Sequence, residues 1–487
     1  MTKYSGLLGD KNSLRKLMLF VGFLVFGISA IAIPSRSTYG AQVSVDEPQY
    51  LLTALSIGED LDLDISDEIE EEKFRSFHEI GLNTQTIDMN SSGQRLSPHD
   101  PLLPLLLSVP MRIAGWVGAR ALLAVFAGLL ASSTLWVAVR RFKVSPKTAA
   151  WVVGAFGAAP PLCSYGSQIY PEVPAALAVV LAIASATGAP SKRNAAAFVL
   201  SITALPWLSV KYMPVALTIF LLVAFVKKKT ERQFISAYTA VSFVLMAAIY
   251  LLFHKFVYQG WTVYSAGDHF IENEFNVIGG DPDIWGRSKR FIGLLVDRGF
   301  GLAAWTPSFL IFPAAFGFLC KKKVDSWQYL VFPFLIGWST ATWLAFTMHG
   351  WWWPGRQTVA VLPLAVIAIA IAIDNFKKFL FPTVFATVVG SIGWIWIAVE
   401  AQTGRRALIV DFEDTSWPWY KIWSKIFPDY HNMPANTMWI AAIWSFVIVL
   451  FFSIGWRSVN GNKNPFRSKR ANTDVVTTDL NSGSSIR

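Results

Sequence analysis

Blocks of about 18–22 apolar residues recur along this chain, with short polar or charged segments between them. Such a block is long enough to cross the ~30 Å hydrocarbon layer of a membrane as an α-helix. The blocks lack the alternation of apolar and polar residues that the strands of a membrane β-barrel would show. The composition agrees, because 53% of the residues are hydrophobic and only 15% are charged. The sequence therefore predicts an all-α polytopic membrane protein, in which each spanning segment satisfies its own backbone hydrogen bonds.

We expect about twelve transmembrane helices from the number of these blocks. The fifth and sixth are the least regular, because Pro206 and Pro214 interrupt one long apolar stretch. All belong to one transmembrane domain, residues 1–456, and the polar, basic segment 457–487 is predicted to be a disordered cytoplasmic tail. The expected spans are 17–34, 119–139, 148–163, 173–189, 195–210, 213–226, 235–253, 301–319, 328–346, 357–373, 379–399 and 436–455.

The net charge of +10 is divided unevenly between the two sides of the predicted membrane. If the spans alternate, the basic clusters fall on the side of the N-terminus and most acidic residues fall on the other side, as the positive-inside rule requires. We therefore expect a plasma (inner) membrane protein with both termini in the cytoplasm and its functional loops outside. Basic clusters placed in this way contact anionic lipid, which argues against nucleic acid as a partner. They are Arg140–Lys143, Lys192-Arg193, Lys227–Lys229, Lys321–Lys323 and Lys377-Lys378.

The first outer loop is the longest and spans residues 35–118. Within it, Pro48–Ile57 is predicted to form a short amphipathic helix in the outer membrane interface. Residues 101–117 are apolar but broken by prolines, which indicates a second interfacial or re-entrant element. The acidic run 59–72 partly matches the spacing of a calcium-binding loop. However, Ile65 stands where that loop needs glycine, so a solvated acidic strip is favoured.

The acidic dipeptide Asp46-Glu47 lies in this loop, shortly after the first span. A carboxylate at the mouth of a membrane bundle can act as a general base, and a low dielectric would raise its pKa toward the operating pH. Adjacent helical residues point about 100° apart, so only one of the two can face a substrate. We assign Asp46 as the catalytic base, with Glu47 supporting it or exchanging with it. Alternatively, both are ordinary acids that cap the helix beginning at Pro48.

Three cations are predicted near the outer ends of spans, namely Lys211, Arg298 and Arg356. Charges at this depth are costly and often mark ligand sites. The phosphate of a polyprenyl carrier would sit at the same depth, and an arginine can bind it with two hydrogen bonds. We assign all three to donor phosphate binding. The alternative is that they are anchors whose charged ends reach the membrane surface.

Five further residues on the outer side are candidates for substrate binding. His349 and Trp352 belong to a Trp-rich loop that could stack on a sugar, although Trp is also common in membrane interfaces. His99 could polarise a hydroxyl or phosphate, or simply precede a helix. Tyr170 and Glu172 lie in a short outer turn, where Glu172 could meet an acceptor or cap the following span.

The order and sidedness of these motifs resemble the GT-C superfamily of membrane glycosyltransferases. The likeness is to the bacterial branch near the protein O-mannosyltransferases and the aminoarabinose transferases of lipid A, and it covers residues 40–400. The motifs that carry it are Asp46–Leu51, Ser97–Pro104, Tyr165–Glu172, Asp297–Leu302 and Trp353–Arg356.

The resemblance implies a GT-C-like helical fold and a sugar donor linked to polyprenyl phosphate. It also implies an inverting displacement, in which Asp46 deprotonates an acceptor hydroxyl and cations stabilise the leaving phosphate. The acceptor would be a glycan, lipid or protein of the cell envelope, and mannose or arabinose are plausible sugars. No cofactor is expected on this scheme, and no residue is assigned to a metal.

The alternative function is that of a multi-span transporter or lipid flippase. Transporters carry internal repeats and polar residues in broken helices near the middle of the membrane. This sequence shows no long internal repeat, and its polar residues gather in the outer loops. These features favour an enzyme acting at the membrane surface.

Overall fold

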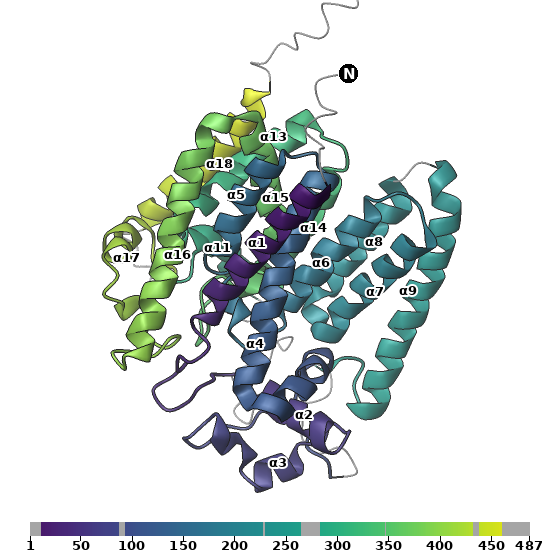
Figure 1. Ribbon diagram of the computed structural model, residues 1–487, viewed down its shortest axis with the longest axis vertical. Coiled ribbons are helices and arrows are strands. Elements are labelled where there is room, and N and C mark those ends of the chain that lie inside the picture. Colours follow the sequence, from purple (N-terminus) through teal and green to yellow (C-terminus); the bar gives the residue numbers. More distant parts are fainter. Residues whose placement is uncertain are drawn as a thin grey trace, which may run out of the picture.

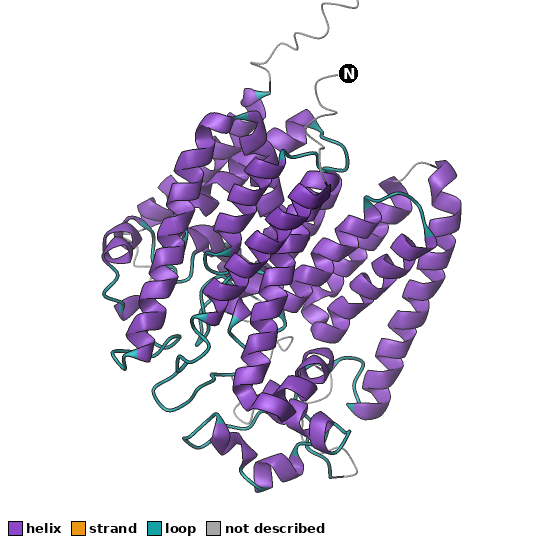
Figure 2. Cartoon of the chain, viewed as in Figure 1, coloured by secondary structure: helices purple, strands orange, loops and turns teal. Residues whose placement is uncertain are grey.

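The computed structural model describes residues 11–86, 93–226, 229–263, 283–345, 347–431 and 438–459. Within these ranges the regular secondary structure is helical, accompanied by isolated β-bridges (Figure 2). This confirms the predicted all-α class. From residue 460 onward, the segment predicted to be a disordered tail lies outside the described residues.

The twelve apolar blocks overlap helices, although some, such as 301–319, are divided among several short helices. Within the described residues, five helical segments are long and apolar enough to cross a membrane, at Asn12–Ala30, Leu102–Arg140, Ala240–Val257, Lys377–Gln402 and Met438–Ser458. The structure therefore supports a membrane protein, while the number of spans stays a prediction. The longer helices are α1 (Lys11–Ala30), α4 (Leu102–Arg140), α5 (Pro146–Gly157), α6 (Glu172–Ala186), α7 (Lys192–Leu208), α8 (Met213–Val226), α9 (Lys229–Val257), α13 (Phe312–Lys322), α14 (Gln328–Ser339), α15 (Leu362–Asn375), α16 (Leu380–Gln402) and α18 (Met438–Ser458).

Shorter helices lie mostly in the connections between these. The predicted helix at Pro48–Ile57 is confirmed as α2, which begins one residue before Pro48, a residue that favours the first turn of a helix. The others are α3 (Ser66–Glu70), α10 (Ile284–Ser288), α11 (Arg290–Val296), α12 (Leu302–Trp305) and α17 (Pro418–Trp423). The short 3₁₀ turns used below are η3 (Val210–Tyr212) and η7 (Arg356–Thr358).

The helices form a bundle (Figure 1), and its two ends differ in the charged residues that they carry. One end, where α1 begins, carries basic segments that contact one another across the bundle. There Arg141 Nε donates to the carbonyl of Ala184 at 2.9 Å, and Lys322 Nζ donates to Asn375 Oδ1 at 2.5 Å. The opposite end carries α2 and α3 (Figure 1). We call these the basic end and the acidic end.

α4 consists of two helical stretches that meet at a kink, close to the boundary that the sequence placed between the apolar segment 101–117 and the span beginning at residue 119. The interfacial position of the first stretch stays a prediction. The helix is kinked at Ala114 and Gly115, where the backbone leaves helical geometry and Gly115 takes φ of 60°. Glycine tolerates this positive φ without the steric cost of a side chain. Pro110, the more obvious breaker, lies inside the helix four residues earlier.

α1 packs against α4 at a close crossing of small residues. A Cβ added to Gly128 would lie 2.7 Å from the backbone oxygen of Gly22, closer than real Cβ atoms approach. Close helix contacts of this kind depend on glycine in membrane bundles. α1 and α4 are thus held in close contact through small residues.

Gly128→Ala is expected to destabilise the protein by about 1–3 kcal/mol, because overpacking forces the two backbones apart. The measurement is thermal unfolding of the purified protein in detergent. Gly27→Ala is the control, since a Cβ there meets nothing within 4 Å. The control should be neutral or slightly stabilising through its better helix propensity. Equal midpoints for both variants would contradict the close crossing.

Candidate functional site

Four charged side chains from distant segments meet at the acidic end of the bundle. Arg356 Nη2 donates to Asp46 Oδ2 at 2.7 Å, and its Nε donates to Glu172 Oε1 at 3.1 Å. Lys211 Nζ donates to the same Glu172 oxygen at 2.8 Å. We call Asp46, Glu172, Lys211 and Arg356 the charge cluster. Its two carboxylates and two cations make it formally neutral, as a buried set of charges should be.

Local structure explains how each member reaches the cluster. Asp46 precedes α2, and Glu172 is the first residue of α6, directly after Pro171. Lys211 lies in η3, a break between α7 and α8 that follows Pro206. Arg356 begins η7 directly after Gly355, whose φ of 84° favours glycine. Helix ends and turn residues thus bring the four side chains together.

Asp46 remains partly open to solvent within this cluster. Its side chain is 16% exposed, whereas those of Arg356 and Glu172 are 8% and 1% exposed. Burial is the largest single influence on Asp46 and opposes its ionisation. The charges of Arg356, His99 and Lys211 together outweigh it, so the pKa of this carboxyl lies below its usual value. The sequence reasoning expected a raised pKa, because it did not foresee the pairing with Arg356.

Glu47 is fully buried, and its hydrogen bonds go to residues outside the cluster. Its Oε2 accepts hydrogen bonds from the backbone N–H of Ser44 at 2.7 Å and from Ser44 Oγ at 3.2 Å. Its Oε1 accepts from the N–H of Ile169 at 2.6 Å. These contacts tie the start of α2 to the turn before α6. Asp46, although it is the N-cap residue of α2, makes no capping hydrogen bond with its side chain. The two acids therefore differ in role, and Glu47 has the environment of a structural residue.

Glu47→Gln is expected to destabilise the protein by about 1–3 kcal/mol, because an amide NH₂ would face a backbone N–H donor and leave it unsatisfied. Thermal unfolding in detergent measures the effect. Glu70→Gln, which alters an exposed acid on α3, is the matched control and should leave the midpoint unchanged. A stable Glu47→Gln protein would remove the structural role assigned to Glu47.

Arg120 is a site-supporting residue that the sequence reasoning missed. It is fully buried in α4 and donates to the carbonyls of Ile33, at 2.7 Å, and Ser35, at 2.9 Å. It also donates to Ser37 Oγ at 3.0 Å and to the carbonyl of Gln42. Arg120 thereby fixes the segment that leads to Asp46. An arginine at the edge of an apolar block was the available signal, because such charges are costly in lipid.

Aromatic rings surround the charge cluster. The Arg356 guanidinium lies 3.9 Å above the ring of Tyr170 and 5.0 Å from the ring of Trp352. Tyr170 Oη donates to the carbonyl of Ser44 at 3.4 Å. These cation–π contacts hold the guanidinium plane in a fixed orientation. Of the neighbouring tryptophans, Trp353 is fully buried and Trp351 is 65% exposed, so only Trp352 combines exposure with a contact to the cluster.

His99 lies beside the cluster and is held by the residues around it. Its ring stacks on that of Tyr50, with the ring centroids 4.4 Å apart. The next residue, Asp100, is buried and accepts hydrogen bonds from His254 Nε2 at 3.0 Å and from the backbone N–H of Val210 at 2.9 Å. Asp100 thus links the start of α4 to α9 and to the turn that carries Lys211. In the sequence, Asp100 belongs to the motif Ser97–Pro104, but no role was predicted for it.

Arg298 and His349 lie in a different group. Arg298 Nη2 donates to the carbonyl of Phe427 at 3.4 Å, and its Nε has no hydrogen-bond partner among the described residues. His349 Nε2 lies 3.8 Å from Asp297 Oδ1, and its ring is 4.9 Å from that of His431. Among the described residues, the polar contacts of both side chains stay within this region and do not reach the charge cluster. The structure therefore joins Asp46, Lys211, Arg356, Tyr170, Glu172, Trp352 and His99 but leaves Arg298 and His349 apart.

No protein-family model, curated protein or solved structure matches this chain.

Proposed function

We propose that this protein is a GT-C-like membrane glycosyltransferase. It transfers a sugar from a polyprenyl-phosphate donor to an acceptor in the cell envelope, outside the plasma membrane. The observation that carries the proposal is the charge cluster, in which a partly exposed carboxylate is paired with an arginine at one end of an apolar helical bundle. The basic clusters at the other end support an orientation in which that end faces the cytoplasm. In this proposal about twelve spans connect the cytoplasmic end with the outer end.

Asp46 is the base in this mechanism. An acceptor hydroxyl donates its proton to the Asp46 carboxylate and attacks the anomeric carbon of the donor sugar. The bond from that carbon to the phosphate oxygen breaks, and the polyprenyl phosphate leaves. The configuration at the anomeric carbon of the transferred sugar is inverted. Arg356 and Lys211 stabilise the charge that the leaving phosphate gains, which is the interaction that most lowers such barriers.

The pairing of Asp46 with Arg356 suggests how donor and acceptor steps are coupled. In the free protein Arg356 holds the pKa of Asp46 low, which makes the carboxylate a weak base. A donor phosphate competes for the same guanidinium, since arginine binds phosphate with paired hydrogen bonds. Asp46 then loses its strongest counter-charge, and its pKa rises. The base is thereby strengthened only when the donor is present.

The position of the charged groups favours a transferase over a transporter or flippase. Asp46, Glu172, Lys211 and Arg356 lie in loops and at helix ends. Transport sites are typically built from unwound segments in the middle of membrane helices. His99, Tyr170 and Trp352 adjoin the cluster and are our candidates for contact with the sugar or acceptor.

The test is a transfer assay with purified protein in detergent, polyprenyl-phosphate sugars as donors, and cell-envelope glycan, lipid and peptide fractions as acceptors. Release of polyprenyl phosphate coupled to a glycosylated product supports the proposal. Donor movement between leaflets of a proteoliposome without sugar transfer would instead establish a flippase.

Arg298 is also proposed to contact the donor phosphate, although its own contacts lie around Phe427 and apart from the charge cluster. Arg298→Ala is expected to raise the KM for the donor by about 10- to 100-fold with a smaller change in kcat, because a charge-assisted hydrogen bond is worth roughly 1.5–3 kcal/mol. Arg405→Ala, which alters an exposed arginine, is the control. An unchanged donor KM in the Arg298 variant would assign its side chain to packing of the loop around Phe427 alone.

A further inference from the structure

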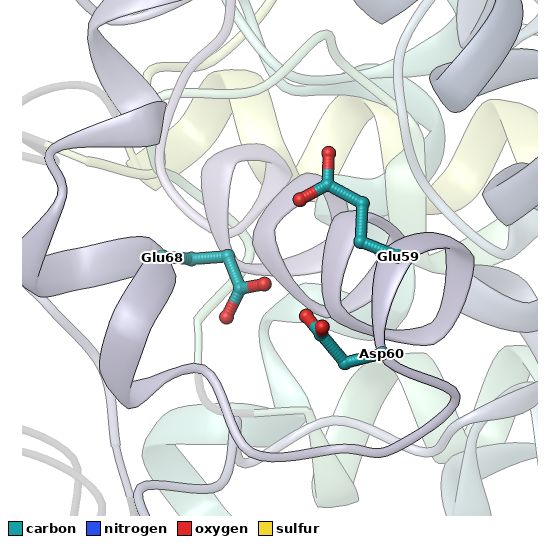
Figure 3. A group of neighbouring side chains, drawn as sticks. All are labelled: Glu59, Asp60 and Glu68. Atoms are coloured by element: carbon teal, nitrogen blue, oxygen red, sulfur yellow. The ribbon is translucent and has the colours of Figure 1, made fainter.

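Three carboxylates converge where α2 ends. Glu59 is the last residue of α2, Asp60 is its C-cap, and Glu68 comes from α3. Figure 3 shows the Glu68 and Asp60 side chains pointing toward each other, with Glu59 alongside. One oxygen from each of the three lies within 4.8 Å of the others. Oxygens bound to one Ca²⁺ at about 2.3–2.6 Å can be separated by up to twice that distance, so the three fit a single ion.

The surroundings of the Glu68 carboxylate are a second observation that points to a cation at this group of carboxylates. Its side chain is fully buried, and among the described residues neither carboxylate oxygen has a hydrogen-bond partner of ordinary geometry. Burial, and secondly the neighbouring Asp67 carboxyl, raise the pKa of Glu68 to about 8. The nearest described cation is Lys73, whose Nζ lies 3.6 Å from Glu68 Oε1. A buried carboxylate without hydrogen bonds is strongly unfavourable unless a cation compensates it.

Lys73 compensates only part of the charge. Its Nζ makes its short contact, 2.8 Å, with Glu59 Oε2 rather than with Glu68. The same Nζ also lies 3.5 Å from Asp67 and 3.6 Å from Glu71, so four carboxylates share one ammonium and leave negative charge that a divalent cation would offset. Glu59 and Asp60 are exposed, so water can complete the coordination sphere.

The site differs from the calcium-binding loop that the sequence spacing suggested. Asp62 and Asp64 are used within the turn, where their Oδ1 atoms accept hydrogen bonds from the backbone N–H groups of Asp64, at 3.0 Å, and Ser66, at 3.1 Å. The ligands therefore come from the end of one helix and the face of the next.

We propose that Glu59, Asp60 and Glu68 bind a Ca²⁺ ion that fastens the end of α2 to α3. An oxygen-only ligand set suits Ca²⁺ better than Zn²⁺, which favours nitrogen and sulfur. The carbonyl end of a helix also attracts cations. The other end of α2 begins beside Asp46, so the ion braces the helix that positions the charge cluster. This proposal does not depend on the proposed transferase activity.

The experiment is isothermal titration calorimetry of the full-length protein in detergent, after EDTA treatment, with CaCl₂ and separately with MgCl₂. We expect one Ca²⁺ per chain with Kd of about 10⁻⁴–10⁻³ M, the range of extracellular calcium modules. Ca²⁺ should also raise the thermal midpoint, because it binds only the folded state. Absence of a saturable Ca²⁺ signal up to tenfold above this range, or equal binding of Mg²⁺, would overturn the proposal.

Matched variants separate a defined site from a diffuse acidic surface. Asp60→Asn and Glu68→Gln should each weaken Ca²⁺ binding at least tenfold, whereas Glu70→Gln on α3 should leave it unchanged. Asp60 is exposed, so its variant keeps the test valid if Glu68→Gln does not fold. Equal weakening in the Asp60 and Glu70 variants would mean that the ion is attracted only by the overall negative charge.

Discussion

Asp46→Asn is expected to lower kcat for sugar transfer by about 10²–10⁴-fold, the contribution typical of a positioned general base. The amide cannot accept the proton of the acceptor hydroxyl, yet it keeps the size and part of the polarity of the carboxylate. Arg356 would still have Glu172 as a partner, since its Nε donates there at 3.1 Å. Folding should therefore be preserved, as judged by the thermal midpoint and by gel filtration in detergent.

The pH dependence of the wild type gives a second readout of Asp46. Since the folded pKa is depressed, the carboxylate is ionised at all pH values above the usual Asp pKa of about 3.9, and it is protonated only as the pH falls further. We expect kcat/KM, which reports the free enzyme, to show no acidic limb between pH 5 and 8. With saturating donor, kcat should fall on the acidic side at a higher pH than kcat/KM does. The reason is that the donor phosphate binds Arg356 and so removes the positive charge that lowers the pKa of Asp46.

The control for Asp46→Asn is Asp325→Asn, which alters an exposed aspartate away from the charge cluster. It should retain full activity. If Asp46→Asn also retains activity, the base must be another carboxylate. Glu172 is the nearest candidate, because its Oε2 has no hydrogen-bond partner among the described residues.

The helical blocks were predictable because an apolar run of span length has few alternatives to helix in lipid. The helix over Pro48–Ile57 was predictable for a similar reason, since Pro48 favours a helix start. The kink in α4 lies at Ala114 and Gly115, close to the boundary that the apolar pattern indicated between residues 117 and 119. The positive φ of Gly115 was not predictable, because Pro110 was the more visible breaker. The backbone conformation at such a kink depends on tertiary packing rather than on local helix propensity.

For the candidate site too, the sequence predicted part of the picture, namely the residues, whereas their contacts required the structure. The sequence indicated Asp46, Lys211 and Arg356 as candidate functional residues, because charged residues near the ends of spans are costly and often mark ligand sites. Their grouping was not predictable from the sequence, since Arg356 pairs with Asp46 and Glu172 across 310 and 184 residues, and Lys211 joins them only through Glu172. Without the pairing, the pKa of Asp46 was expected to shift in the opposite direction. Arg298 was grouped with these cations by type alone, although its contacts lie elsewhere.

Arg356→Met is expected to have the largest combined effect, with activity falling by at least about 10²-fold and stability by roughly 3–5 kcal/mol. The activity loss reflects removal of a donor aimed at the leaving phosphate. The stability loss arises because Asp46 and Glu172 would keep their negative charges with only Lys211 to balance them, and unpaired buried charge is costly. Transfer kinetics and thermal unfolding measure the two effects separately.

A compensating variant distinguishes the two roles of Arg356. In Arg356→Met combined with Glu172→Gln, one carboxylate and Lys211 remain, so the cluster is again formally neutral. Stability should recover most of its loss, whereas transfer should stay at least 10²-fold below wild type, because neutrality does not restore the guanidinium. Recovery of both would show that Arg356 only balances charge. Recovery of neither would mean that its contacts with Tyr170 and Trp352, rather than its ion pairs, hold the loop in place.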